Sequence, residues 1–258
     1  MIERSVLVIG DSLAFHGPAG PEPLTHPGLY PNVVARLAAA RVDVVARAGW
    51  TARDAWWALC KDPVLHSVLL PRADAVVLAV GSSDQLPASL PTYLKDGIAY
   101  VRPGWLRRAV RRGYHRAHPL IVRRAGAPLR ALPQRATDAY LTRCVQAVRL
   151  VRPGAPVVGM VPAPYDSPHH GHVTRPHPPA VLAAIAWGER TGVPLVDADR
   201  IVAPHLAAGR LNPDGMHWSW EAHAAFGAAL ASRLRAAWGG PEPAADGNPV
   251  PASTVTPP

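Results

Sequence analysis

The sequence of 258 residues is poor in cysteine and lysine and contains no long hydrophobic stretch. Its two cysteines, Cys60 and Cys144, are too few for a disulfide framework and lack metal-ligand spacing, so we expect two core thiols. The longest apolar runs, residues 6–9 and 76–80, fall far short of the ~18–20 residues that cross a bilayer. We therefore expect neither a disulfide-stabilised secreted protein nor a membrane-spanning one.

The two ends of the sequence carry separate expectations. Residues 1–4 (MIER) include an acid where a signal peptide carries positive charge, which favours a cytoplasmic location. Residues 239–258 are rich in proline and alanine, so we expect a disordered tail there. Residues 1–238 are expected to form a single domain, because a chain that is 48% hydrophobic and 17% charged can build a buried core.

Positive charge is concentrated in one segment. The net charge is +9, yet residues 95–135 hold 11 basic residues and one acid, which leaves a net charge of −1 for the rest of the chain. Such a segment favours anionic partners, although a solvated basic face is the alternative for any single arginine. It lacks a recognisable RNA- or DNA-reading motif, so we predict no nucleic-acid partner.

Short apolar runs alternate with helical patterns along the chain. Strands are expected over residues 5–9, 42–46, 75–80, 156–161 and 194–196, and helices over residues 30–40, 52–60, 137–150, 180–190 and 219–237. This alternation predicts an α/β fold with a parallel sheet. Residues 85 to about 135 interrupt it after the third expected strand, and they are expected to form a basic, mostly helical insertion.

Small polar residues follow two of the expected strands. Residues 10–12 (GDS) follow the first strand and residues 81–84 (GSSD) follow the third. In an open parallel sheet, ligand sites form outside the carboxyl ends of the strands, so these two loops can face one crevice. A serine just past a strand can turn its N–H toward an oxyanion. The alternative is that Asp11 and Ser12 merely cap a helix.

A second motif, residues 212–217 (NPDGMH), precedes the last expected helix. Asp214 stands three residues before His217 across a glycine turn, so its carboxylate can accept the imidazole Nδ1–H and leave Nε2 free. A serine nucleophile needs such a base, held in one tautomer by an acid. Alternatively, Asp214 is a capping residue beside an incidental histidine.

Together these motifs resemble the SGNH hydrolase superfamily, also called GDSL esterases. Residues 10–12, Gly49 after the second strand, residues 81–84 and the Asp214–His217 pair match its four blocks in order. The resemblance implies a flavodoxin-like three-layer α/β/α sandwich with a five-stranded parallel sheet. It also implies that Ser12 is the nucleophile, His217 the base and Asp214 the acid that orients the base.

The oxyanion hole that the resemblance implies consists of the backbone N–H groups of Ser12 and Gly49 and a third donor at position 83. The superfamily has asparagine at this third position, whereas this chain has Ser83. Either the shorter hydroxyl replaces the amide, or the site works with two donors.

A narrower resemblance is to the actinobacterial diglucosylglycerate octanoyltransferases. Residues 49–57, 86–91, 100–108 and 212–218 carry it, and it includes the basic segment. It implies transfer of an octanoyl group from octanoyl-CoA to a hydroxyl of diglucosylglycerate, in methylglucose lipopolysaccharide biosynthesis, without a cofactor. A GDSL-type esterase is the alternative, because the same residues hydrolyse esters when water reaches the acyl-enzyme.

Aromatic and charged residues near the motifs are the expected substrate contacts, since flat aromatic faces suit sugar rings or acyl chains. The residues expected to bind substrate are Asp11, Trp50, Trp56, Trp57, Asp84, Arg107, Arg108 and Trp218. For Trp56 and Trp57 the alternative is packing against the sheet. Arg107 and Arg108, with Arg111 and Arg112 one helical turn later, are expected to hold anionic substrate groups. We predict no metal, because His169, His170, His172 and His177 lack ligand spacing and a nearby cysteine.

Overall fold

The computed structural model describes residues 4–127 and 129–239. The tail expected over residues 239–258 lies outside the described residues apart from Gly239. Within them, five parallel strands form one sheet in the order β4-β1-β5-β8-β9. These strands are β1 (Arg4–Gly10), β4 (Ala40–Ala46), β5 (Ala75–Ala79), β8 (Val157–Val161) and β9 (Leu195–Asp197). This is the flavodoxin-like order 2-1-3-4-5, which confirms the predicted fold class.

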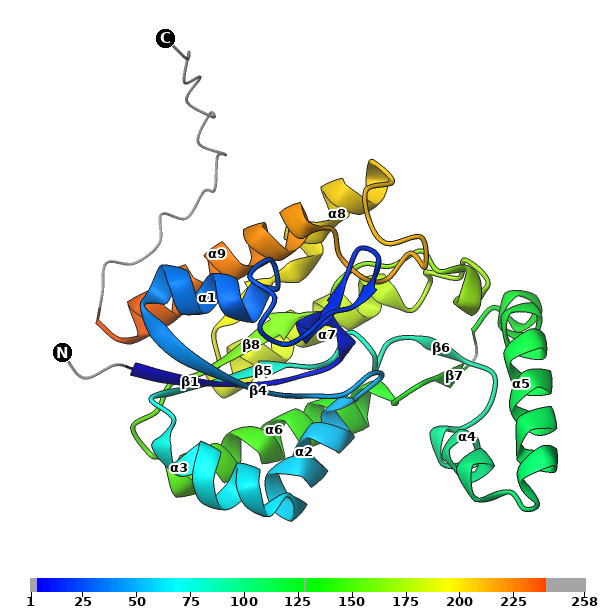
Figure 1. Ribbon diagram of the computed structural model, residues 1–258, viewed down its shortest axis with the longest axis horizontal. Coiled ribbons are helices and arrows are strands. Elements are labelled where there is room, and N and C mark those ends of the chain that lie inside the picture. Colours follow the sequence, from blue (N-terminus) through cyan, green and yellow to red (C-terminus); the bar gives the residue numbers. More distant parts are fainter. Residues whose placement is uncertain (1–3, 128, 240–258) are drawn as a thin grey trace, which may run out of the picture.

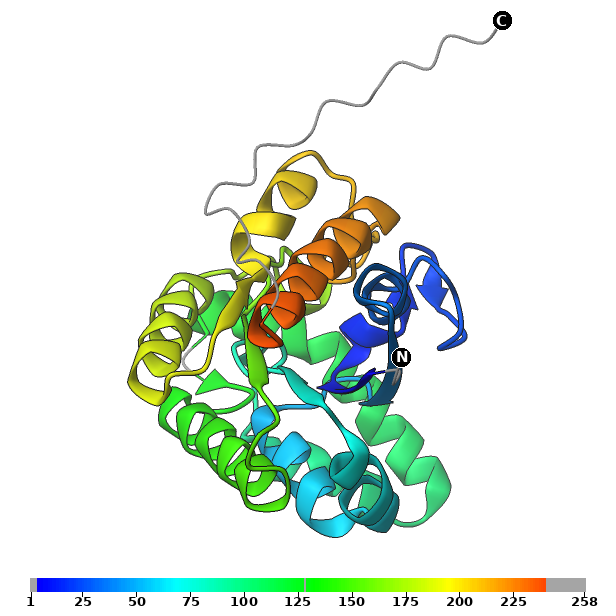
Figure 2. The same ribbon diagram turned by 90° about the vertical axis from the view of Figure 1, so that its left-hand side faces the viewer.

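Helices cover both faces of this sheet (Figure 1). One layer contains α1 (Tyr30–Ala38), α8 (Ala198–Ala207) and α9 (Trp220–Ala237). The opposite layer contains α2 (Ala52–Lys61), α3 (Leu70–Arg72), α6 (Gln134–Val151) and α7 (His177–Thr191). Figure 2, which looks along the strands, shows the two layers on opposite sides of the sheet. The sequence pattern did not predict α8.

The core has two halves, one on each face of the sheet, because successive side chains of β1 point to opposite faces. Val6 and Val8 pack under α1 and α9, whereas Leu7 and Ile9 face α2 and α6, and all four are at most 1% exposed. A strand buried on both faces needs apolar residues at every position, which explains the continuous run in the sequence. Cys144 lies in the second half of this core as expected. The prediction for Cys60 is wrong, because its side chain is exposed near the end of α2.

The segment between β5 and α6 contains two short strands and two helices. The strands β6 (Pro87–Ala88) and β7 (Leu129–Arg130) pair in antiparallel fashion. Between them lie α4 (Thr92–Gly97), a single turn η3 (Ile98–Tyr100) and the 22-residue α5 (Gly104–Ala125). Figure 1 shows α4 and α5 beyond the carboxyl ends of the sheet strands, on the side opposite the N-terminus of β1.

The remaining elements are short. They are η1 (Ser12–Ala14), β2 (His16–Gly17), β3 (Gly20–Pro21), η2 (Leu65–Leu69) and η4 (Pro168–His170). β2 and β3 form a small hairpin directly after the first sheet strand. No helix within residues 4–127 and 129–239 is both long and apolar enough to cross a membrane.

Candidate active site

A cavity of about 1350 Å³ lies at the carboxyl ends of the strands. Loops that follow β1, β4, β5 and β8 form its floor, and α4 and α5 supply one wall. Ser12, Gly49, Ser83 and His217 all line it, so the four sequence motifs meet in space. The parallel sheet accounts for this meeting, because the carboxyl ends of its strands share one edge.

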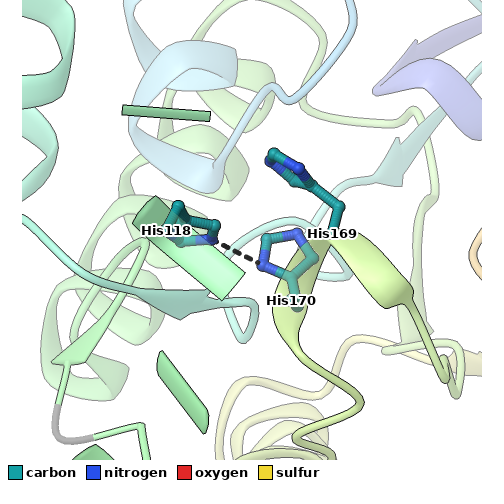
Figure 3. A group of neighbouring side chains, drawn as sticks. All are labelled: His118, His169 and His170. Atoms are coloured by element: carbon teal, nitrogen blue, oxygen red, sulfur yellow. Dashed lines mark hydrogen bonds between the residues drawn. The ribbon is translucent and has the colours of Figure 1, made fainter. Parts of the chain in front are cut away.

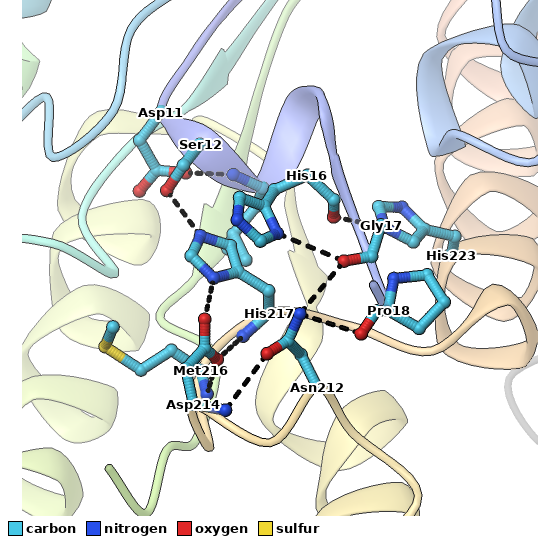
Figure 4. Close-up of polar contacts among 11 residues, drawn as sticks. Asp11, Ser12, His16, Gly17, Pro18, Asn212, Asp214, Met216, His217 and His223 are labelled. Carbon is cyan, nitrogen blue, oxygen red and sulfur yellow. Dashed lines mark hydrogen bonds and ion pairs between the residues drawn. The ribbon is translucent and has the colours of Figure 1, made fainter. Parts of the chain in front are cut away.

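Ser12, His217 and Asp214 form a continuous hydrogen-bonded chain (Figure 4). The Ser12 Oγ lies 2.9 Å from Nε2 of His217, and the Nδ1 of the same ring lies 2.5 Å from Oδ2 of Asp214. Because an ionised carboxylate only accepts, Nδ1 carries the proton and Nε2 is free to take one from the serine. The arrangement is that of a serine nucleophile with an oriented base.

The turn at residues 212–217 fixes Asp214. Its Oδ1 accepts hydrogen bonds from the backbone N–H groups of Met216 at 2.9 Å and His217 at 3.0 Å. Partial burial works to raise the pKa of this carboxyl, but its hydrogen bonds with the ring and backbone of His217 and the Met216 N–H hold the pKa well below its usual range. Asp214 is therefore ionised throughout the neutral range.

Gly215 lets this turn approach the neighbouring loop. Its φ of +70° is in the left-handed region, and a Cβ there would lie 1.8 Å from the carbonyl oxygen of Asp166. The Asp166 N–H in turn donates to the Gly215 carbonyl at 2.8 Å. A side chain at this position would push the turn away from the loop after β8, so the glycine is required by the close contact.

Asp11 and Ser83 form a second polar pair beside the chain. Asp11 caps η1, since its Oδ1 accepts from the Leu13 N–H at 3.0 Å, as the capping alternative predicts. The Ser83 hydroxyl donates to Asp11 Oδ2 at 3.0 Å. Burial raises the pKa of Asp11 to about 6, against the lowering effect of these hydrogen bonds. The hydroxyl expected in the oxyanion hole is thus directed at Asp11.

Asp84 is not on the cavity wall, so its predicted place among the substrate contacts is not supported. Its buried carboxylate accepts from the Ala52 N–H at 3.1 Å and from the Thr137 hydroxyl at 2.9 Å. It therefore joins the start of α2 to the start of α6. Burial raises its pKa to about 7.

Of the tryptophans expected to bind substrate, the cavity lining includes Trp50 alone. Trp218 is 0% exposed and packs against Tyr30 and Phe226 in the core. Trp56 packs against the opposite half of the core. Trp57 is on the outer side of α2, where Arg53 and Lys61 lie over its ring. Closeness to a motif in sequence did not predict side-chain direction, because successive side chains point to different sides.

One face of α5 supplies the basic part of the wall. The residues of α5 that line the cavity recur at helical spacing and include Arg107, Arg108 and Arg111. Arg112, expected beside them, does not line the cavity. Asp96 carries negative charge on the same wall, but it is paired with Arg53 at 3.1 Å.

Two residues that were not predicted from the sequence contact this series of hydrogen-bonded side chains. The ring of His16 lies against that of His217, and Asn212 donates to the carbonyl oxygens of Gly17 at 3.3 Å and Pro18 at 2.8 Å. Asn212 also accepts from the Asp214 N–H at 3.0 Å, so it joins the β2–β3 hairpin to the turn (Figure 4). Asn212 belongs to the NPDGMH motif, from which its role could have been suspected, whereas no motif of the sequence includes His16.

Two groups of side chains within the described ranges have the composition of a metal site. One is His16, Asp214 and His217, in which the Asp214 carboxylate and the His217 ring are engaged in the hydrogen bonds above. The other is His118, His169 and His170, where α5 meets η4 on the cavity wall (Figure 3). The sequence could not place His118 beside the other two.

Comparisons with known proteins give close relatives and distant structural neighbours. Diglucosylglycerate octanoyltransferase from Mycobacterium tuberculosis is 41% identical over 226 residues, covering 86% of this chain and 88% of the relative. The enzyme of the same name from Mycolicibacterium hassiacum is 41% identical over 221 residues, covering 86% and 90%. No protein-family model matches the sequence.

The structural neighbours are esterases and acylhydrolases. A lipase/acylhydrolase from Enterococcus faecalis superposes with a TM-score of 0.60 at 16% identity, covering 90% of this chain and 96% of the neighbour. A carbohydrate acetylesterase family member from Sinorhizobium meliloti gives 0.59 at 17% identity, covering 92% and 99%. At such identities the likeness shows the fold alone. The close relatives show more: the chain belongs to the diglucosylglycerate octanoyltransferase family and has the SGNH (GDSL) hydrolase fold that its motifs predict.

Proposed function

We propose that this protein is an acyltransferase that moves an octanoyl group from octanoyl-CoA to a sugar hydroxyl of diglucosylglycerate. The observation that carries the proposal is the series of hydrogen bonds from Asp214 through His217 to Ser12, of which His217 and Ser12 line the cavity. The sequence is also 41% identical to enzymes of that name. The cytoplasmic location predicted from the sequence suits a CoA thioester as donor.

The first half of the reaction forms an acyl-enzyme. The Ser12 Oγ attacks the thioester carbonyl carbon while His217 Nε2, 2.9 Å away, takes the serine proton. Asp214 stabilises the imidazolium that forms. When the tetrahedral intermediate collapses, the carbon–sulfur bond breaks, His217 gives its proton to the departing sulfur, and CoA leaves as the free thiol. Ser12 is then an octanoyl ester.

The second half transfers the acyl group. A hydroxyl of the acceptor gives its proton to His217 Nε2 and attacks the ester carbonyl carbon. Collapse breaks the bond to Ser12, whose Oγ recovers the proton from His217. In both halves, charge develops on the carbonyl oxygen, and the backbone N–H groups of Ser12 and Gly49 are the donors proposed to hold it. Ser83 then serves mainly to hold Asp11, to which its hydroxyl donates.

The cavity suits two substrates better than one small ester. Its volume of about 1350 Å³ exceeds the ~300–1,000 Å³ typical of small-molecule sites. Trp50, Leu86 and Leu90 give the lining apolar surface for an acyl chain, and Arg108 and Arg111 supply positive charge. Both the phosphates of CoA and the carboxylate of glycerate are anionic, so either can bind this charge.

Hydrolysis of medium-chain esters is the second candidate, because the structural neighbours are esterases and water can replace the acceptor hydroxyl. The experiment that separates the two is incubation of the protein with octanoyl-CoA, with and without diglucosylglycerate, followed by mass spectrometry of products and intact protein. We expect octanoylated diglucosylglycerate, and without acceptor an octanoyl adduct on Ser12. Free octanoic acid as the main product in the presence of acceptor would favour the esterase.

The variant Ser12→Ala tests the covalent mechanism in the same experiment. It should lose the protein adduct and several orders of magnitude in turnover while its far-UV circular dichroism stays unchanged, because Ser12 begins the short turn η1 at the cavity and is not part of the buried core. Near-normal transfer by this variant would exclude the covalent mechanism.

A further inference from the structure

Three histidines from two separate elements converge on the cavity wall. His118 lies on α5, and His169 and His170 lie on η4 (Figure 3). One ring nitrogen of each lies within 4.8 Å of those of the other two. His118 and His170 are buried, whereas His169 is exposed. Imidazole is the commonest metal ligand in proteins, so the grouping raises the question of a cation.

The two buried rings face each other through a hydrogen bond that a metal can replace. The Nδ1 of His170 lies 3.2 Å from Nε2 of His118 and 3.1 Å from the carbonyl oxygen of Pro87. Without a metal, Nδ1 of His170 carries the proton, because the carbonyl can only accept, and the lone pair of His118 Nε2 accepts from it. A cation bound between these two nitrogens would take the place of the proton, which would move to Nε2 of the His170 ring. The Nδ1 of His118 donates to Ser89 Oγ at 2.8 Å, and an oxygen acceptor on the other nitrogen is the usual support of a metal-binding histidine.

We propose that His118, His169 and His170 bind one divalent transition-metal cation of the Zn²⁺ type, which fastens α5 to η4. Tetrahedral Zn²⁺ with ~2.0–2.1 Å bonds brings ligand nitrogens to about 3.3 Å apart, so the cluster must close by up to about 1.5 Å. Rotation of the exposed His169 ring can supply most of that movement. Three imidazoles without a carboxylate suit Zn²⁺, Co²⁺ or Ni²⁺ and disfavour Mg²⁺ and Ca²⁺.

The position of the site gives it a structural role beyond the proposed acyl transfer. His118 is on the same face of α5 as Arg108 and Arg111, and His169 and His170 also line the cavity. The two elements already pack closely, because a Cβ on Gly171 would lie 2.5 Å from the carbonyl oxygen of Pro119 on α5. A cation here would hold the basic wall of the cavity against the sandwich.

The test uses full-length protein that has been treated with EDTA and desalted. Titration with ZnCl₂ in a calorimeter should show one site per chain, and titration with CoCl₂ should give the visible absorption of tetrahedral Co²⁺. Removing only a hydrogen-bond partner of a ligand already costs ~10–100-fold in metal affinity, so His169→Ala should weaken binding at least 10-fold. His169 is exposed, so this variant should keep its fold, and His118→Ala is the second variant.

His172→Ala is the matched control, because His172 is an exposed histidine of the same loop and its ring pairs with Asp166. It should bind Zn²⁺ as the unaltered protein does. Trypsin digestion gives a readout independent of activity: Zn²⁺ should slow cleavage at the arginines of α5 in the unaltered protein but not in His169→Ala. Unchanged affinity in both His118→Ala and His169→Ala, or no binding of Zn²⁺ to the unaltered protein at 100 µM or so, would overturn the proposal.

Discussion

The imidazole of His16 lies flat against that of His217, with ring centroids 3.6 Å apart and planes inclined by 14°. His16 is itself held in place, since its Nδ1 contacts the Gly17 carbonyl at 3.0 Å and its own carbonyl accepts from His223 Nε2 at 3.1 Å. Burial and the charge that His217 can carry lower the pKa of His16. A neutral ring thus covers one face of the proposed base and limits its rotation.

This stack predicts the effect of replacing His16. His16→Ala should lower kcat about 10-fold or more while KM changes little, because misplacement of a reacting group by ~1 Å can cost about 10²-fold. His16→Phe keeps a flat ring against His217 and should recover most of the lost rate. Steady-state kinetics on octanoyl-CoA measure both. A loss that Phe fails to recover would assign the effect to the ring nitrogens of His16 rather than to stacking.

Ser83 stands where the SGNH superfamily has asparagine, and its hydrogen bond to Asp11 predicts that replacing it has only a small effect on the rate of acylation. Loss of an oxyanion donor typically costs about 10²–10³ in rate. Because the Ser83 hydroxyl donates to Asp11, Ser83→Ala should slow acylation less than about 10-fold. The burst of nitrophenol from p-nitrophenyl octanoate measures this step. A 10²-fold slower burst would place the hydroxyl in the oxyanion hole after all.

The lining of the cavity predicts which arginines of α5 bind the anionic substrate. Charge reversal of Arg108 and Arg111 should raise KM for octanoyl-CoA about 10-fold at low salt and leave hydrolysis of neutral p-nitrophenyl octanoate nearly unchanged. This increase in KM should become smaller as the salt concentration rises, because exposed charges are screened over ~8 Å at physiological ionic strength.

Arg112 and Arg116 provide the control for this experiment. Both are exposed on the same helix and do not line the cavity, so their reversal makes the same change in net charge elsewhere. If reversing Arg112 and Arg116 raised KM as much as reversing Arg108 and Arg111, overall charge rather than the cavity face would hold the substrate.

Buried Asp84 predicts a pH dependence of stability. Burial raises its pKa from 3.8 to about 7, so the native state binds this proton more tightly than the unfolded chain does. The stabilisation of the native state that comes from this tighter proton binding is fully present below about pH 4 and is lost as the pH rises through about 7. The free energy of unfolding of Asp84→Asn, relative to that of the unaltered protein, should therefore rise by roughly 1–3 kcal/mol between pH 5 and pH 8, since one pKa unit corresponds to about 1.4 kcal/mol. Urea unfolding at both pH values measures this gain. The exposed carboxylate variant Glu189→Gln should show no such change.

The sequence predicted the sheet and the motif positions well, because both depend on local patterns. Continuous apolar runs mark strands buried on two faces, and the short Asp214–His217 spacing already confines an acid to the reach of an imidazole. Directions of side chains were harder. Trp218, next to His217 in sequence, points into the core, whereas His16 and His118 reach the site through a hairpin and a distant helix. Such contacts depend on tertiary packing, which periodicity does not encode.

The proposed nucleophile and base stand 205 residues apart in the chain and meet only across the finished sheet. A chain growing on the ribosome therefore carries Ser12 long before it carries His217. Through most of its synthesis, the serine hydroxyl has no partner to take its proton. The reactivity that we propose for Ser12 can arise only when α9 emerges and packs against α1, which brings the turn before α9 to the cavity. The order of the elements thus delays chemistry until folding is nearly complete.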